Sequence, residues 1–171
     1  MSWNSEGLLN RIEWSENRLA IAQRVQLPAV LASLVDQIRG YFFDGEPIGL
    51  IPWNQIDQSD WSDFQKDVYL VMANIPHGET RTYGWVAARL GRTSASRAVG
   101  QALRKNPLPI VIPCHRITTA TVRGGLEENP SHPEVRLKCR LMHLEEEYRS
   151  PQFSFLKTGS ARLDCGQVTP S

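Results

Sequence analysis

Residues 106–117, NPLPIVIPCHRI, decide how the rest of the sequence is interpreted. Three β-branched residues at 110–112 predict a short buried strand. Pro113 cannot donate to a sheet ladder, so this strand should end there and expose Cys114 at its tip. His115 and Arg116 follow, and neighbours of this kind lower the pKa of a thiol. Cys114 is therefore a candidate nucleophile, although a small core residue is the plainer interpretation.

Length and composition limit the classes of protein. A chain of 171 residues with 41% hydrophobic residues suits one ordinary domain, or one domain with a small appendage. The sequence contains no apolar run of about 18 residues and no secretory signal pattern, so we expect a cytoplasmic or nuclear protein without a membrane span. The cysteines have neither disulfide-framework nor zinc-site spacing: Cys114, Cys139 and Cys165. We therefore expect no metal site.

The net charge of +1 conceals an uneven distribution of charge. Residues 81–123 contain eight basic residues and no acidic residue, whereas residues 41–80 contain seven acidic residues and only Lys66 as a basic one. A basic run is usually a solvated face. A segment of this length without a carboxylate indicates a surface that faces a polyanion.

Hydrophobic periodicity predicts the outer elements. Residues 7–25 are interpreted as two short strands, and residues 29–43 as a helix closed by Gly45. An apolar stripe predicts a second helix up to Pro76: Trp61, Phe64, Val68, Val71, Met72 and Ile75. Pro133 suits the first turn of a last helix, whose Glu145, Glu146 and Glu147 could orient a histidine.

Two short helices lie between these elements. Thr82 can cap residues 83–90, which end at Gly91, and Thr93 or Ser94 can cap residues 95–106. These proportions fit a helix-turn-helix, with a plain αα-hairpin as the alternative. The second helix presents one long cation, Arg97, among small residues that permit close approach of another surface: Ala95, Ser96, Ala98 and Gly100.

Cys114 and His115 are adjacent, which constrains any chemistry between them. Neighbouring residues on a strand point to opposite faces, so proton transfer between these two needs a turn at 114–115 or a bridging water. A third group is also needed to fix the imidazole, and the glutamates of the last helix are the candidates.

Residues 60–145 resemble the O6-alkylguanine-DNA alkyltransferases, suicide DNA-repair proteins also called methylated-DNA–protein-cysteine methyltransferases. The resemblance rests on FQKDVYLVMANIPHGETRTYGWVAARLG, SRAVGQALRKNP and PIVIPCHRI, in family order and spacing. It implies an α+β fold: a reduced N-terminal ribonuclease-H-like portion (residues 1–55), then a mostly helical DNA-binding and alkyl-transfer domain (56–150). Residues 151–171 are expected to be a flexible tail.

The resemblance also implies roles for individual residues. Cys114 is similar to the alkyl acceptor, and His115 and Glu145 to its partners in a cysteine–water–histidine–glutamate relay. Asn106 resembles the residue that links the helix-turn-helix to the active-site segment. Tyr83 resembles the tyrosine that helps rotate the nucleotide, and Arg97 the finger that fills the vacated stack. The implied DNA contacts also include the recognition-helix face and two arginines: Ala95, Ser96, Ala98, Gly100, Arg92 and Arg104.

The implied activity is a single-turnover transfer from O6 of a flipped guanine to Cys114, without a cofactor, by a monomer acting on double-stranded DNA. One departure from the family keeps an alternative open. After Gly124 and Gly125 the family has an aromatic residue, whereas this chain has Glu127 and Glu128. A lesion sensor that binds alkylated bases without repairing them is the alternative, although such proteins replace the cysteine. A cysteine hydrolase would need an oxyanion hole, and a helix-turn-helix regulator would leave PCHR unexplained.

Overall fold

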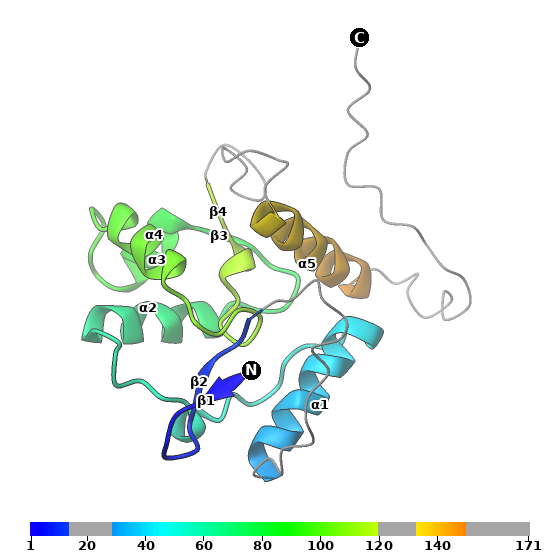
Figure 1. Ribbon diagram of the computed structural model, residues 1–171. Helices are drawn as coiled ribbons and strands as arrows, with labels where there is room; N and C mark the ends of the chain where they lie inside the picture. The colour runs from blue at the N-terminus through cyan, green and yellow to red at the C-terminus, as the bar shows by residue number, and fades with distance from the viewer. Residues whose placement is uncertain (14–28, 120–132, 150–171) are drawn as a thin grey trace.

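The structure is a computed structural model that describes residues 1–13, 29–119 and 133–149. These residues form a helix-rich α+β fold with few strands, as the sequence predicted in outline (Figure 1). The α-helices are α1 (Ala29–Asp44), α2 (Asp63–Ala73), α3 (Tyr83–Arg89), α4 (Ser96–Arg104) and α5 (Pro133–Arg149). No helix among the described residues is long and apolar enough to cross a membrane.

The N-terminal part contains strands β1 (Ser2–Trp3) and β2 (Leu9–Arg11), which pair antiparallel. The sequence predicted a strand near β2 but did not predict β1, and the remainder of the proposed strand pair lies outside the described residues. Helix α1 agrees with its prediction, and Gly45 follows it with φ +72°, a left-handed conformation that favours glycine. This part joins the rest of the fold through a bridge from Leu9 to Ile56.

Helix α2 agrees with the predicted apolar stripe. Ser62 and Gln65 form a reciprocal capping box at its start, which satisfies backbone N–H groups that a helix leaves without partners. Along and beyond the helix, Val68, Met72 and Ile75 are buried, so this stripe provides the centre of the main core.

Helices α3 and α4 form the predicted pair. The Thr82 side chain caps α3 by accepting a hydrogen bond from the Trp85 amide at 3.1 Å, and Gly91 has φ +68° in the turn. The predicted cap of the second helix is wrong. Its N-cap is Ala95, without a side-chain bond, because residues 93–95 form a turn in which the Ala95 amide donates to the Arg92 carbonyl at 2.8 Å.

The predicted strand at 110–112 is also wrong. Ile110 has φ +75°, and the Ile112 amide donates to the Leu108 carbonyl at 2.8 Å, so the chain turns here. The segment contains only an isolated bridge, between Pro109 and Ile112. Pro109 and Pro113 lack a backbone N–H, so neither can extend this bridge into a ladder. The 3₁₀-helix η2 (Cys114–Arg116) follows, so the backbone turns at the cysteine–histidine pair.

Strand β4 (Ile117–Thr118) continues from η2 and pairs parallel with β3 (Arg81–Thr82). This pairing holds residues 114–118 beside the helix pair. A second apolar cluster, Tyr41, Ile110 and Leu141, connects α1, the turn before Cys114 and α5. In Figure 1, α1 and α5 lie on one side of β4, and α2, α3 and α4 lie on the other.

Candidate active site

Cys114 opens η2 and is half-buried, so its thiol lies at the edge of the core. The Asn106 side chain braces the segment before it. Its Nδ2 donates to the Ile112 carbonyl at 2.8 Å, and its Oδ1 accepts from the Leu108 amide at 3.0 Å. Asn106 thus ties the end of α4 to the turn that carries Cys114. Its role in catalysis stays a prediction.

His115 and Glu145 meet in the interior. Nε2 of His115 lies 2.7 Å from Oε1 of Glu145, and each residue is only 1% exposed. Because a carboxylate only accepts hydrogen bonds, Nε2 carries the proton and Nδ1 keeps its lone pair. Within the described part of the chain, Nδ1 of His115 is buried without a hydrogen-bond partner. Nδ1 is therefore the ring atom that can take up a proton.

Arg116 is buried against the same carboxylate. Its Nη2 lies 2.9 Å from Oε1 of Glu145, and its Nε lies 3.0 Å from Oε2. Nη1 donates to the Ile75 carbonyl at 2.6 Å, and the Gly78 amide donates to Oε2 at 2.8 Å. Arg116 therefore does not belong to the basic surface in which its position in the sequence had placed it.

The charge states follow from these contacts. Burial raises the pKa of Glu145, but hydrogen bonds from His115 and Arg116 outweigh it and hold that pKa far below its ordinary value. Burial lowers the pKa of His115, and the positive charge of Arg116 acts in the same direction, against the opposing effect of Glu145. The site thus holds a neutral imidazole beside an ionised Arg116–Glu145 pair, an arrangement suited to accepting a proton.

Two contributors were missed by the sequence analysis. The Tyr41 hydroxyl donates to Oε1 of Glu145 at 2.8 Å, from a helix far away in the sequence. His77 lies with Nδ1 3.3 Å from Nη2 of Arg116 and 3.6 Å from Oε1 of Glu145. Tyr41 occupies an ordinary apolar helix position and His77 a proline-containing turn, so neither position carried a sequence signal.

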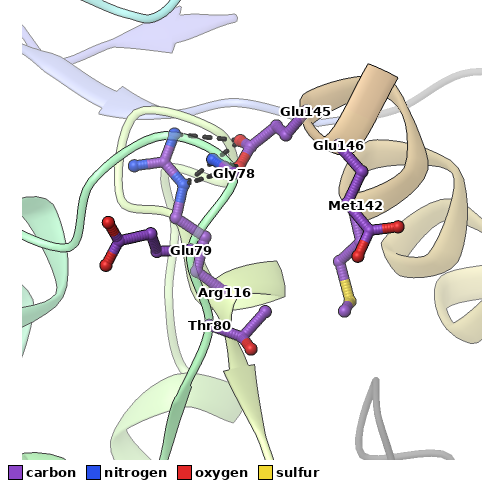
Figure 2. A pocket seen from close by; sticks show the side chains of 7 residues that line it. All are labelled: Gly78, Glu79, Thr80, Arg116, Met142, Glu145 and Glu146. Carbon is purple, nitrogen blue, oxygen red and sulfur yellow. Dashed lines mark hydrogen bonds and ion pairs between the residues drawn. The ribbon is translucent and has the colours of Figure 1, made fainter. Parts of the chain in front are cut away.

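A small cavity of about 30 Å³ opens onto the Arg116–Glu145 ion pair. It lies between residues 78–80, which precede β3, and α5. Figure 2 shows Arg116 and Gly78 directed at Glu145, with Glu146 and Met142 on the opposite wall. Cys114 does not line this cavity. The cavity therefore lies beside the carboxylate and not beside the thiol. The loop predicted to wall the alkyl pocket, with Gly124, Gly125, Glu127 and Glu128, lies outside the described residues.

The predicted DNA contacts lie on and around α4. Arg97 and Ala98 are exposed, whereas Ala95, Ser96 and Gly100 are half-buried. A Cβ atom built at Gly100 would lie 3.8 Å from Cε1 of Tyr83, so Tyr83 packs beside this helix. Arg104 and Arg92 are exposed, and Arg92 lies over the Phe64 ring. Fewer of the small residues on this side of α4 are exposed to solvent than the sequence suggested. The contacts with DNA stay predictions.

The described residues contain no group of three or more His, Cys, Asp or Glu side chains that could hold a metal ion.

At the start of the basic segment, residues 81–123, Oε2 of Glu79 pairs with Nη2 of Arg81 at 2.6 Å. Arg81 also lies 5.3 Å from the centre of the Trp85 ring. The charge of Arg81 is therefore partly neutralised at the edge of the basic surface.

Comparisons with known proteins show the family to which the chain belongs. A family described as 6-O-methylguanine DNA methyltransferase, DNA binding domain, matches residues 63–147. The structure resembles that of Mycobacterium tuberculosis OGT in complex with DNA, with a TM-score of 0.64 and 30% identity, covering 85% of each chain. The chain belongs to the O6-alkylguanine-DNA alkyltransferase family. A second structure, of M. tuberculosis O6-methylguanine methyltransferase, gives a TM-score of 0.61 at 31% identity, covering 74% of this chain and 72% of that one.

Curated alkyltransferases match over shorter spans. The methylated-DNA–protein-cysteine methyltransferase of Mycolicibacterium paratuberculosis is 37% identical over 123 residues, which is 69% of this chain and 66% of the relative. That of Methanosarcina acetivorans is 51% identical over 59 residues, which is 34% of this chain and 38% of the relative. The matched segments thus cover less than two thirds of these relatives.

Proposed function

We propose that this protein repairs DNA by transferring an alkyl group from O6 of guanine to Cys114, once per molecule. The observation that carries the proposal is the half-buried Cys114 at a turn, directly followed by a neutral, buried His115 that is bonded to Glu145. Family membership supports the same chemistry. The active form is a monomer that binds double-stranded DNA containing O6-alkylguanine.

The thiol proton passes through a bridging water to Nδ1 of His115, and Glu145 stabilises the imidazolium that forms. The Cys114 sulfur then attacks the alkyl carbon. The S–C bond forms as the C–O6 bond breaks, and the electron pair remains on the guanine. The guanine takes up one proton from solvent, and His115 returns the thiol proton to solvent, so the step is balanced. The product is a thioether that water does not readily cleave, so no second turnover follows. The step needs no cofactor.

A guanine inside a duplex cannot reach the thiol, so the nucleotide has to leave the stack at a cost of a few kcal/mol. The exposed Arg97 would fill the vacated position, and Tyr83 would help rotate the nucleotide and donate a hydrogen bond to the base. Arg92 and Arg104 would contact phosphates without regard to sequence. Such contacts suit a protein that has to inspect any sequence.

We further propose a boundary between residues 1–55 and 56–150, with the first part a reduced ribonuclease-H-like domain. A strand pair followed by α1 supports a small α/β portion. Its buried Leu9 and Leu34 belong to the same core cluster as α2, so the two parts share one interior. The proposed tail, residues 151–171, lies outside the described residues.

The test is the intact mass of the protein after incubation with a duplex that carries one O6-methylguanine. We expect a gain of one methyl group that saturates at one per chain, no gain in Cys114→Ser, and an unchanged gain in Cys139→Ser, a control with another half-buried thiol. No gain together with tight, lesion-selective binding would overturn the proposal in favour of a lesion sensor.

A further inference from the structure

Helix α1 places one polar atom inside the active site. The Tyr41 side chain is fully buried, and its hydroxyl donates to Oε1 of Glu145 at 2.8 Å. The hydroxyl oxygen of Tyr41 also lies 3.3 Å from Nε2 of His115. Through Tyr41, the first 55 residues of the chain reach the His115–Glu145 pair.

We infer that Tyr41 is a positioning residue for alkyl transfer, which fixes the Glu145 carboxylate so that His115 presents Nδ1 as the proton acceptor. This inference rests on the proposed function. The Tyr41 hydroxyl lies against Glu145 and His115, so its effect on transfer passes through these two side chains.

The surroundings of the ring explain why the hydroxyl is held in place. Tyr41 packs in the apolar cluster with Ile110, from the turn before Cys114, and Leu141, from α5. The Phe42 and His77 rings meet it edge-on, with centroids at 5.5 Å and 5.7 Å. The ring is thus held by α1, α5 and the active-site segment, and the position of its hydroxyl depends on all three.

The hydroxyl completes the set of donors on one carboxylate oxygen. Oε1 of Glu145 accepts from Nε2 of His115 and from Arg116, both in η2, and from Tyr41 in α1. An oxygen that accepts several bonds has little freedom to rotate and is a weaker base than one with fewer donors. Tyr41 therefore fixes the direction of the His115 ring and moderates the pull of Glu145 on its proton.

Other charged or titratable groups act on His115 besides Tyr41. They are Glu145 and Lys138 from α5, Arg116 from η2, and His77 from the turn after α2. Replacement of the Tyr41 hydroxyl leaves all four in place, so a change in His115 titration reports on the Tyr41 bond itself.

The decisive variant is Tyr41→Phe, which removes the hydroxyl and keeps the ring. The first measurement is the titration of the His115 ring by NMR on the protein without DNA. With one donor fewer, Glu145 is a stronger acceptor and favours the imidazolium, so His115 should take up its proton at a higher pH than in the wild type. The second measurement is single-turnover methyl transfer, whose rate constant should fall roughly 10-fold, while Kd for the lesion duplex stays within about twofold.

Tyr69→Phe is the matched control. Tyr69 is the other fully buried tyrosine among the described residues, and its hydroxyl donates to the Ala102 carbonyl at 2.9 Å instead of to the pair. Loss of that bond should lower stability by a similar amount and leave the His115 titration unchanged. The inference is overturned if Tyr41→Phe moves the His115 titration no further than Tyr69→Phe does. Because the titration needs no DNA, this result is independent of whether the wild type transfers a methyl group.

Discussion

Arg116 and Glu145 form a buried ion pair in which Nη2 lies 2.9 Å from Oε1 and Nε lies 3.0 Å from Oε2. Arg116 is 6% exposed and Glu145 is 1% exposed, so water screens this pair poorly. The pair keeps the carboxylate ionised next to His115, and through the Ile75 carbonyl and the Gly78 amide it also holds the turn after α2. The residue after the cysteine–histidine pair thus stabilises the site from within.

Arg116→Met should be strongly destabilising. The change leaves the Glu145 carboxylate buried without its charged partner, and the loss of one member of a buried pair typically costs about 3–5 kcal/mol. Urea denaturation measures the free energy of unfolding. Arg11→Met is the matched control, because Arg11 pairs with Glu13 at 3.1 Å where both side chains are exposed. That change should cost about 0–1 kcal/mol. Equal effects of the two substitutions would contradict the role of the buried pair.

Acid should destabilise the fold from about pH 6.5 downward. Burial lowers the pKa of His115 and of His77, so the unfolded chain binds more protons than the folded one below the ordinary histidine pKa, and stability falls as the pH falls. Glu145 acts in the same direction at lower pH, because its pKa is lower in the folded state than in the unfolded chain.

This pH dependence can be separated by substitution. His77→Phe keeps an aromatic ring against Tyr41 and Tyr148 and removes one titrating group, so urea midpoints measured between about pH 7 and 5 should fall less steeply than in the wild type. An unchanged slope in His77→Phe would exclude His77 as a source of the acid sensitivity.

Asn106→Ala should slow alkyl transfer and lower stability. The substitution removes both side-chain bonds to the turn that carries Cys114, and each such bond typically contributes about 1 kcal/mol. We expect a loss of about 1–3 kcal/mol in urea denaturation, with a lower single-turnover rate constant under conditions where the protein stays folded. Asn74→Ala, which removes an exposed bond to the Leu70 carbonyl, is the control and should leave the rate unchanged.

Arg97→Ala should weaken repair in duplex DNA more than reaction with free O6-alkylguanine. The free base needs no rotation out of a stack, so only the duplex reaction depends on a side chain that fills the gap. Rate constants for both substrates provide the measurement. Arg39→Ala serves as the control because Arg39 is an exposed arginine on α1. Equal losses on both substrates would remove Arg97 from nucleotide flipping.

Tyr83→Phe should slow methyl transfer while Cys114 remains present and titratable. The ring that packs beside Gly100 is retained, so the substitution removes the hydroxyl that we propose donates a hydrogen bond to the base. Single-turnover rates give the effect, and alkylation of Cys114 by iodoacetamide shows that the thiol is intact. An unchanged transfer rate would show that this tyrosine does not assist the leaving base.

Local sequence patterns determined much of this protein. The apolar stripe of α2, the Thr82 cap and the glycines at 45 and 91 each act over a few neighbouring residues, so their outcome can be deduced from the sequence. The motif around Cys114 also indicated the family and the thiol. Where the local sequence was compatible with both a strand and a turn, the prediction was wrong. Residues 110–112 have side chains that favour a strand, yet the backbone forms a turn there. The flanking prolines cannot extend a ladder, and Ile110 packs in the cluster with Tyr41 and Leu141.

Tertiary structure alone decided which side chains surround the carboxylate. Three consecutive glutamates on α5 look alike in the sequence, and only packing against α1 and η2 buries Glu145 while Glu146 stays exposed. Tyr41 reaches Glu145 across 104 positions of sequence. Arg116 likewise lies in a basic stretch of the sequence, but the structure buries its side chain in the interior. Such contacts depend on how distant elements pack, and periodicity within a single segment carries no information about them.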